Sequence, residues 1–572
     1  MKTQAMLRWM AVLAGGLRLT LAADQDTSST PVRQIAIIGA GAAGASTAYH
    51  LHKFAEEAGV GINITIFEKT NHIGGRTLTV DAYDDPLERI ELGASIFIAQ
   101  NYILNNATQE FGLLLREPYG EEDELLAIWD GESFVYQQAS NSYWWWDIAK
   151  MFWKYGLAPY RAQKLTQTTV NTFLKLYEAP FFPFRSLTGR AFELDLARIT
   201  GETGEQYLKS NNIGELFSHD IIQAATRVNY ASNLGLIHGL DTMVSMAPEG
   251  AVTVADGNWQ IFDLMVKKTG ASISLNTTVS SIALADHAPG SAQSKYIIKT
   301  RDADIAAGAE DTTNAIAFDD VVLAAPYQFS GIKITADTDD IIDEIPYVQL
   351  HVTLFASPLK LSAEFFNLAA NAKVPTTVLT TLGPGDNATS GASGAGKAGF
   401  FSISTLRTIK NPKTGKAEYL YKVFSPTKLT SEWLSSLLGV EVPETFIKTF
   451  TETAPSTEPE SQGPPETDEL ISWYYPHVFY SYPRAYPRVT FQDPILRDGL
   501  YYTSGVESFI STMETSALMG KNVARLIVDG ILSLETGGAV KGERPLTPTE
   551  ADEQRVLKEE KDQGLPVRPA EL

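Results

Sequence analysis

The sequence predicts an α/β protein whose central parallel sheet is assembled from stretches that lie far apart in the chain. Residues 34–51 are the first indication, because a short apolar run, a glycine-rich turn and a helix-like periodicity follow one another. A second β-like run over residues 62–67 ends in Glu68. The third indication is a strand–loop–helix pattern over residues 499–529. These runs predict a βαβ unit near the start and a last strand that returns to the same sheet.

The glycines of the first turn predict a Rossmann-type dinucleotide site. Gly39 allows a tight turn, Gly41 lets the backbone approach a pyrophosphate, and Gly44 lets the helix pack closely on the strand. The helix that begins beside Ala43 offers N–H groups and a positive dipole end to the phosphates. Glu68 stands where an acidic side chain accepts hydrogen bonds from a ribose. The alternative is a structural strand–helix turn, which the combined spacing makes the weaker interpretation.

A second glycine pair favours FAD over NAD. Glu68 and Lys69 are followed by Gly74, Gly75 and Arg76, which gives the spacing Glu-x5-Gly-Gly-Arg. This spacing resembles the extension that flavin amine-oxidase-type enzymes place behind their second strand. The resemblance implies that the arginine and nearby backbone amides reach the pyrophosphate from the other side. The alternative is a surface arginine in a turn.

Two further stretches are predicted to line the cofactor. Gly93, Ala94 and Ser95 follow a β-like run, and small residues there let the backbone come close to a flat ligand. The alternative is an ordinary strand–turn junction. Residues 270–282 alternate like a strand of the same domain. Resemblance to flavin oxidases implies that Val279 in this strand holds the adenine with its backbone.

The last strand and helix resemble the closing motif of flavin amine oxidases. Gly505 and Glu507 follow the strand, and Thr512 and Met513 precede a helix-like run. The N–H groups of that helix can face the flavin C2 carbonyl, where they stabilise developing negative charge. Glu507 and Glu514 are accordingly interpreted as flavin or helix-terminus partners rather than bases.

The predicted fold class is α/β, with a discontinuous Rossmann-type FAD-binding domain and an α+β substrate domain. The FAD-binding domain is expected to comprise residues 32–100, 245–330 and 491–535, and the substrate domain residues 101–244 and 331–490.

Several stretches stand out by composition. Residues 143–184 are dense in aromatic side chains, which suits a groove for a long apolar substrate or a face resting on a membrane interface. An ordinary aromatic core is the alternative. Residues 383–399 are rich in Gly, Ala and Ser, residues 454–467 in Pro and Glu, and both are predicted to be flexible surface loops. Residues 536–572 are predicted to form a flexible tail.

Overall composition excludes several classes of function. The 572-residue chain carries a net charge of −22, which argues against nucleic acid or an anionic membrane surface as a partner. It contains no cysteine, so thiol catalysis, iron–sulfur clusters and cysteinyl flavin are excluded. Its eight histidines lack the spacing of metal ligands, and no metal site is expected.

The first residues predict entry into the secretory pathway. Residues 1–23 combine a basic start, a short apolar run and small residues suited to cleavage, as in a signal peptide. Glycosylation is predicted at Asn106, Asn276 and Asn387, whereas the sequon at Asn63 falls in a strand expected to be buried. A lysosomal or vacuolar location and an extracellular location are both open.

Three short motifs narrow the resemblance further: Arg-Val-Asn-Tyr at 227–230, Ile-His-Gly-Leu at 237–240 and Ser-Thr-Met-Glu at 511–514. With these motifs, the chain most resembles the prenylcysteine oxidases within the flavin superfamily. Glu-Leu-Gly-Ala-Ser-Ile-Phe at 91–97 also matches, and the resemblance covers most of residues 32–530. The two inserted loops and a Tyr-Trp-Trp-Trp run depart from the family.

The resemblance implies an FAD-dependent oxidase that cleaves the thioether of farnesyl- or geranylgeranyl-cysteine. O2 and water would be consumed, and a prenyl aldehyde, free cysteine and hydrogen peroxide released. His238 is the candidate base that activates water, although a lone histidine is more often structural. One alternative is a secreted flavin oxidase of an amine or of a terpenoid or polyketide intermediate. Another is a non-enzymatic lipid-binding protein, which the intact Glu68 and Arg76 set argues against.

Overall fold

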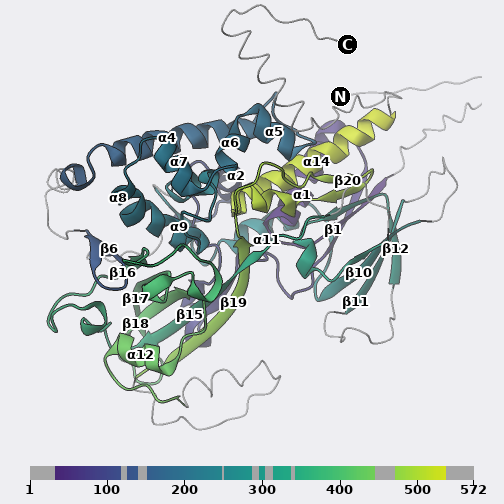
Figure 1. The fold of residues 1–572 in the computed structure, drawn as a ribbon. Helices are drawn as coiled ribbons and strands as arrows, with labels where there is room; N and C mark the ends of the chain where they lie inside the picture. Colours follow the sequence, from purple (N-terminus) through teal and green to yellow (C-terminus); the bar gives the residue numbers. More distant parts are fainter. Residues whose placement is uncertain are drawn as a thin grey trace, which may run out of the picture.

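The structure is a computed structural model, and it shows a layer of helices, a large sheet beneath it, and a second unit of sheets and helices beside them (Figure 1). The described residues are 32–117, 125–138, 151–247, 250–285, 295–302, 314–335, 342–444 and 470–535. Four predicted features lie outside these residues: the signal segment 1–23, the Trp run at 144–146, the loop 454–467 and the tail 536–572.

The first sheet is six-stranded, in the order β20–β21–β13–β1–β2–β9. Neighbouring strands run parallel, except that β20 is antiparallel to β21. Its strands are β1 (Arg33–Ile38), β2 (Ile62–Phe67), β9 (Ser272–Ser274), β13 (Asp320–Leu323), β20 (Ile495–Arg497) and β21 (Leu500–Tyr502). Strands from widely separated parts of the chain therefore meet in one sheet, which confirms the predicted discontinuous α/β fold.

Burial on both faces explains the continuous apolar run of β1. Ile35 and Ile37 have no exposed surface and pack toward the helices on one face. Ala36 and Ile38 pack on the other face against a four-stranded sheet in the order β12–β11–β10–β14. Its strands are β10 (Thr277–Leu284), β11 (Tyr296–Asp302), β12 (Asn314–Phe318) and β14 (Lys333–Ile334).

Two helices from opposite ends of the chain pack closely on the six-stranded sheet. These are α1 (Ala42–Ala58) and α14 (Met513–Glu535), and a Cβ added to Gly520 would overlap the carbonyl oxygen of Ala43. Ser46 donates a hydrogen bond across the same contact to the Ala517 carbonyl, with an Oγ–O distance of 2.6 Å. The helices α2 (Tyr102–Phe111) and α11 (Trp259–Lys267) contact this pair. This packing sets the N-terminal half of α14 against the first turns of α1.

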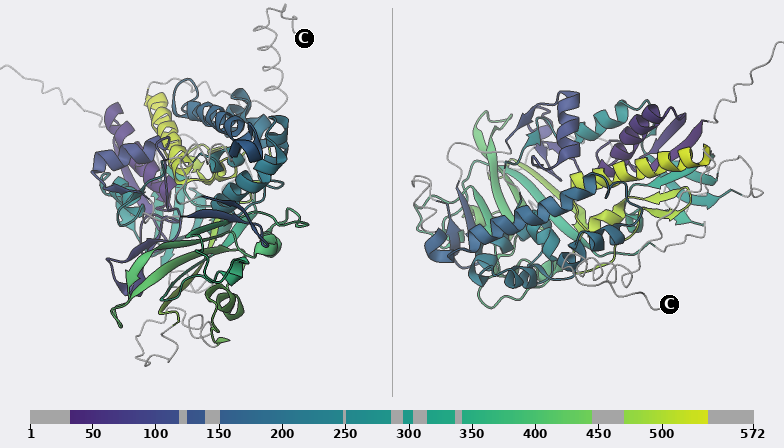
Figure 2. Two further views of the ribbon diagram at one scale, coloured as in Figure 1. Left: turned by 90° about the vertical axis from the view of Figure 1, so that its left-hand side faces the viewer. Right: turned by 90° about the horizontal axis from the view of Figure 1, so that it is seen from above.

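A seven-stranded sheet in the order β19–β15–β18–β17–β16–β6–β7 forms the other half of the molecule. Neighbouring strands are antiparallel except for the parallel pair β16 and β6. Helix α12 (Ser431–Leu438) packs against this sheet. The strands are β6 (Leu126–Trp129), β7 (Phe134–Gln137), β15 (Tyr347–Ser357), β16 (Thr377–Thr380), β17 (Ser402–Lys410), β18 (Ala417–Ser425) and β19 (Trp473–Pro483). Figure 2 shows this sheet on the side of the molecule opposite α14.

A layer of helices lies above the seven-stranded sheet (Figures 1 and 2). Its members are α4 (Ala158–Leu174), α5 (Leu187–Glu193), α6 (Leu196–Thr200), α7 (Gly204–Ser210), α8 (Glu215–Phe217), the π-turn η3 (Ser218–Ile222), α9 (Gln223–Tyr230) and α10 (Gly239–Ser245). Among the described helices, none has both the length and the apolar character needed to cross a bilayer.

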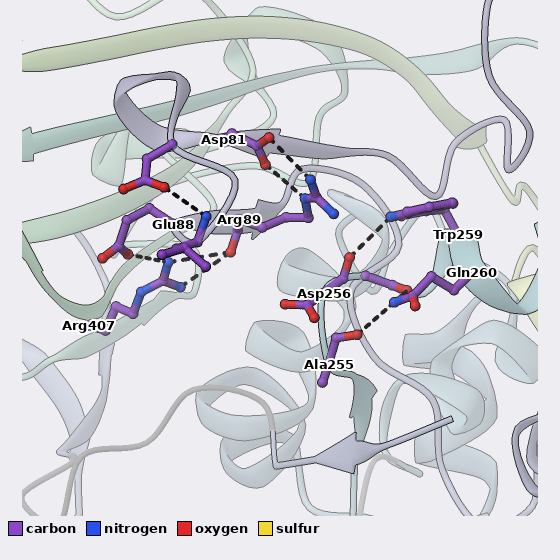
Figure 3. Close-up of polar contacts among 11 residues, drawn as sticks. Asp81, Glu88, Arg89, Ala255, Asp256, Trp259, Gln260 and Arg407 are labelled. Carbon is purple, nitrogen blue, oxygen red and sulfur yellow. Dashed lines mark hydrogen bonds and ion pairs between the residues drawn. The ribbon is translucent and has the colours of Figure 1, made fainter. Parts of the chain in front are cut away.

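A small hairpin connects the two halves. It consists of β3 (Thr79–Asp81) and β4 (Arg89–Glu91), whose ends are joined by an ion pair of 2.8 Å between Arg89 and Asp81. Arg407 of β17 reaches the turn of this hairpin and pairs with Glu88 at 2.9 Å (Figure 3). The hairpin thus ties the segment after the second glycine pair to the large sheet.

The loop at 383–399 lies at the surface over residues 387–393, as predicted, but its end is held by a buried side chain. Arg227 of α9 has no exposed surface and donates hydrogen bonds to the carbonyl oxygens of Gly394 and Ala395, at 3.1 and 2.8 Å. Ala395 is itself fully buried. The small residues that suggested flexibility therefore allow the loop to approach a buried arginine closely.

The sequon at Asn63 also differs from its prediction. Asn63 is exposed although β2 lies inside the sheet. Asn106, Asn276 and Asn387 are exposed as well. Solvent exposure therefore gives no reason to treat Asn63 differently from the other three sequons as a glycosylation site.

Candidate active site

Two of the three glycines in the turn between β1 and α1 are required by the protein's own packing, whether or not a ligand binds. Gly39 has a φ of +103°, and a Cβ there would lie 2.8 Å from the Ala324 carbonyl oxygen. A Cβ on Gly44 would overlap the Gly39 carbonyl oxygen. A Cβ on Gly41 would meet only the Gly75 Cα, at 3.8 Å, which is ordinary van der Waals contact. Packing therefore does not require glycine at 41, and the open backbone there fits a pyrophosphate.

The second glycine pair lies directly on this turn. The Gly74 amide donates to the Ala40 carbonyl at 3.0 Å, and Gly41 and Gly74 form a parallel bridge. Gly74 and Gly75 both have positive φ, at +123° and +57°. Gly41 caps α1 without a side-chain hydrogen bond, and the first turn of α1 carries no acidic residue. Two segments of polar backbone and a positive helix end thus converge, as an anionic diphosphate requires.

Glu68 holds the end of β2 against the same turn. One of its carboxylate oxygens accepts a hydrogen bond from the Ala40 amide at 2.8 Å, and the other accepts from the amide and hydroxyl of Thr70, both at 2.8 Å. The Thr277 amide donates to the Glu68 carbonyl at 2.9 Å, which places the start of β10 beside it. A carboxylate has about four acceptor positions, so Glu68 can still accept from a ribose.

The strand β10 carries the residue predicted to hold the adenine. Val279 is buried, with 3% of its surface exposed, and its pairing with β11 shifts register between Val279 and Ser281. Such a bulge leaves backbone groups outside the regular ladder. Lys69, also predicted to contact the cofactor, is exposed next to Glu68.

An ion pair connects the second glycine motif with the closing motif. The Arg76 guanidinium lies 2.8 Å from the Glu507 carboxylate and also donates to the Ser481 carbonyl of β19 at 2.7 Å. Tyr347 of β15 donates to the other Glu507 oxygen at 3.1 Å. Burial acts against the charged form, but the Glu507 carboxylate outweighs it and raises the pKa of Arg76 above its ordinary value. The predicted cofactor residues Arg76 and Glu507 thus lie together, and Arg76 remains charged.

The closing motif itself is built from η8 (Ser504–Ser508) and the start of α14. Gly505 is tightly packed, since a Cβ there would lie 2.5 Å from the Gln492 carbonyl oxygen. Thr512 caps α14 by accepting a hydrogen bond from the Thr515 amide at 3.1 Å, directly before Met513. Glu514 accepts from the amides of Ile103 and Leu104 at 2.9 and 3.1 Å, so it caps α2 as a helix-terminus partner.

The segment after β4 contains a polar cluster that the sequence did not reveal. Gly93 lies against the Arg76 carbonyl, and a Cβ there would overlap that oxygen. Ser95 donates to the Gly93 carbonyl at 2.8 Å. Lys422 of β18 donates to the Glu91 carbonyl at 2.7 Å and to the Ser95 hydroxyl at 3.2 Å. Burial lowers the pKa of Lys422 to about 8.

Glu91 is the acidic member of this cluster. It is 2% exposed, and one carboxylate oxygen accepts from the Asn258 amide at 2.6 Å. Its other oxygen has no hydrogen-bond partner within the described part of the chain. Burial raises the pKa of Glu91 to about 7. A lysine inside the apolar run of β18 was the one sequence signal that could have revealed this cluster.

His238 occupies a structural position at the N-terminal cap of α10. Its Nδ1 accepts a hydrogen bond from the Asp241 amide at 3.2 Å, and none of its surface is exposed. Burial lowers the pKa of His238 to about 4, so the ring is neutral. A base that activates water must contact that water. The buried position therefore disfavours the predicted catalytic role.

A row of aromatic rings on β19 leads to Gly93. Trp473 and Tyr475 stack with centroids 6.1 Å apart, Tyr475 and His477 follow at 6.3 Å, and His477 contacts Phe479 at 4.2 Å. A Cβ on Gly93 would lie 3.5 Å from the Phe479 ring. Because side chains alternate along a strand, these four rings share one face of β19.

Comparison with known proteins places the chain in a family. The sequence profile of the prenylcysteine lyase family matches residues 138–535, and that of the NAD(P)-binding Rossmann-like domain matches residues 37–110. A farnesylcysteine lyase from Arabidopsis thaliana is 26% identical over 531 residues, covering 90% of this chain and 91% of that protein. Prenylcysteine oxidase 1 from Mus musculus is 25% identical, covering 91% of this chain and 93% of that protein.

A solved structure has the same fold. A triple mutant of putrescine oxidase superposes with a TM-score of 0.50 at 13% identity, covering 87% of this chain and 99% of that chain. At this identity the likeness concerns the fold alone. The family match, the relatives and the fold together confirm the resemblance seen in the sequence: the chain belongs to the prenylcysteine lyase family and is a flavin-dependent oxidoreductase.

Proposed function

We propose that the protein is an FAD-dependent oxidase of prenylcysteine, with farnesyl- or geranylgeranyl-cysteine as substrate. The thioether R–CH2–S–Cys, water and O2 would give the aldehyde R–CHO, free cysteine and hydrogen peroxide. The relatives named farnesylcysteine lyase and prenylcysteine oxidase 1 support this substrate class. Bound FAD would supply the two-electron oxidation of the carbon next to sulfur and the reduction of O2.

The described residues fit the shape and charge of FAD. The open backbone at Gly41 and the uncapped start of α1 suit the pyrophosphate, and Glu68 suits the ribose. Arg76 is held charged beside this backbone by Glu507. The start of α14 supplies a second positive helix end.

The row of rings on β19 is the observation that carries the substrate assignment. A prenyl chain is long, apolar and unsaturated, and half-buried aromatic rings bind such a chain with little loss of conformational entropy. The row ends at Phe479, which contacts the backbone at Gly93 where the flavin is expected. A chain lying along this row would present its sulfur-bearing end to that backbone. The rings would also exclude water from the carbon that is oxidised.

The proposal for the cell compartment rests on sequence. We infer that the enzyme enters the secretory pathway, with a lysosomal, vacuolar or extracellular destination, because residues 1–23 have the character of a signal peptide. The exposed sequons at Asn106, Asn276 and Asn387 suit glycosylation on that route. Endoglycosidase treatment of secreted protein, followed by mass spectrometry of these three sites, tests this inference.

Product analysis tests the activity. Purified protein is incubated in air with farnesylcysteine, and farnesal, cysteine and peroxide are measured. We expect equal amounts of the three products. S-dodecylcysteine is a matched control, because its saturated chain lacks the allylic C–H bonds, and we expect little or no aldehyde from it. Turnover of amines or free terpenoids without turnover of farnesylcysteine would show that the substrate assignment is wrong and that the protein is nevertheless a flavin oxidase.

A further inference from the structure

The short helical segment that precedes α4, together with the first turn of α4, presents a group of large apolar side chains to solvent. Phe152 is 59% exposed, Trp153 92%, Leu157 51% and Tyr160 65%. Residues 151–155 are helical and lead through a turn at Gly156 into α4. An exposed cluster of this size is unusual on a soluble protein and indicates an interaction surface.

The exposed group is not a displaced part of the core, because the helix already has a complete buried face. Ala158, Ala162 and Phe173 of α4 are between 1% and 8% exposed. Tyr155 is also buried, its ring contacts Phe217 at a centroid distance of 5.3 Å, and its hydroxyl donates to Asp220 at 3.0 Å. The outward apolar side chains therefore lie on two consecutive helical segments that are each packed on the core through other residues.

The same stretch is basic in an acidic protein. Residues 151–177 contain Lys154, Arg161, Lys164 and Lys175, and none of the chain's 68 acidic residues. Lys154 pairs with Asp220 at 2.8 Å. Arg161 and Lys164 are exposed and follow Leu157 and Tyr160 within about one helical turn. Because charges separated by more than about 8 Å are screened at physiological salt, this local charge counts more than the net charge of −22.

We propose that this surface, formed by Phe152, Trp153, Leu157, Tyr160, Arg161 and Lys164, docks the protein on an anionic lipid bilayer. Aromatic side chains insert at the boundary between headgroups and acyl chains, and neighbouring basic groups contact anionic headgroups. Apolar and basic side chains in one place match the two layers of an anionic bilayer, the acyl chains and the headgroups. Figure 1 shows this end of α4 at the left edge of the molecule, far from α1 and α14. The proposal does not depend on the identity of the substrate.

Vesicle co-sedimentation of the full-length protein tests the proposal. We expect binding to vesicles of phosphatidylcholine with phosphatidylserine, and weaker binding to phosphatidylcholine alone. Replacing Phe152 and Trp153 by serine should weaken binding at least about ten-fold, because two large apolar side chains are lost from the interface. K164E should weaken binding several-fold at low salt, with the difference disappearing in high salt. Leu87→Ser removes a side chain that is 89% exposed elsewhere, and its binding should equal that of the wild type.

Three outcomes would overturn the proposal. One is the absence of vesicle binding by the wild type, and another is unchanged binding by the Phe152 and Trp153 double variant. The third is a dimer, detected by light scattering, that the same variant dissociates, since a second copy would then cover the surface. Vesicle binding is measured without substrate, so its failure leaves the proposed oxidase activity untouched.

Discussion

Arg76 and Glu507 form an ion pair of 2.8 Å between segments that lie near opposite ends of the described chain. Tyr347 of β15 donates to Glu507, and the Ser481 carbonyl of β19 accepts from Arg76. Two strands of the seven-stranded sheet therefore also contact the pair. One interaction thus joins the second glycine motif, the closing motif and the seven-stranded sheet. It holds a cation beside the glycine turn, where a diphosphate would bind.

Breaking this pair should release the flavin. In E507Q the carboxylate is replaced by a neutral amide of similar shape, so Arg76 loses its anionic partner and keeps its hydrogen bond to the Ser481 carbonyl. We expect flavin affinity to fall about ten-fold or more, measured as the ratio of flavin to protein absorbance after dialysis. R89M removes another arginine–carboxylate pair of 2.8 Å, with Asp81 in the hairpin, and should keep its flavin (Figure 3). Equal flavin content in both variants would contradict the assignment.

The three glycines of the first turn should respond differently to alanine. Gly41→Ala fits the packing and should give a folded protein with little flavin, because the added methyl group points into the open space beside Gly75. Gly44→Ala overlaps the Gly39 carbonyl and should lower the melting temperature strongly. Gly214→Ala is the control, since its Cβ meets nothing within 4 Å. A Gly41→Ala protein with full flavin content would show that no pyrophosphate lies there.

Glu91 should make stability depend on pH. Its folded pKa of about 7 lies above the ordinary value of 4.5, so the folded state binds the proton more tightly. The stability that this proton provides is complete below about pH 4.5 and is lost as the pH rises through about 7. E91Q should therefore be more stable than the wild type at pH 8 by about 1–3 kcal/mol, with little difference near pH 4.5. Urea denaturation at both pH values checks this, and an unchanged difference would contradict it.

His238→Asn separates a capping role from a catalytic one. Asparagine can accept the hydrogen bond from the Asp241 amide that the imidazole accepts now. We expect kcat for farnesylcysteine to stay within a few-fold of the wild type. Loss of a general base would lower kcat by about 10²–10⁴-fold. A fall of that size with an unchanged melting temperature would restore His238 as the base.

The sequence predicted those features of the site that depend on local backbone geometry. Gly39 is required by its positive φ, Gly44 by its contact with the Gly39 carbonyl in the same turn, and Glu68 ends the strand that lies beside that turn. Such constraints leave a fixed spacing in the sequence. The closing motif could be placed because its strand and helix resemble those of a known superfamily.

Features that depend on pairing between distant strands could not be predicted. Lys422 contacts Ser95 only because β18 passes the end of the hairpin, and no spacing in the chain encodes that meeting. The burial of His238 could not be predicted, because it depends on packing against the distant segment at Ala485. The Ala485 carbonyl accepts a hydrogen bond from the His238 amide at 2.8 Å. The buried anchoring of the end of the loop at 383–399 could not be predicted either, because its partner, Arg227, lies far away in sequence.

Anaerobic mixing of the flavin-loaded protein with farnesylcysteine tests the central claim most directly. The absorbance of oxidised flavin near about 450 nm is followed in a stopped-flow instrument, and air is then readmitted. We predict rapid bleaching, release of farnesal, and recovery of the absorbance with formation of peroxide. A flavin that stays oxidised with farnesylcysteine, and with geranylgeranylcysteine, would contradict prenylcysteine oxidation by this protein.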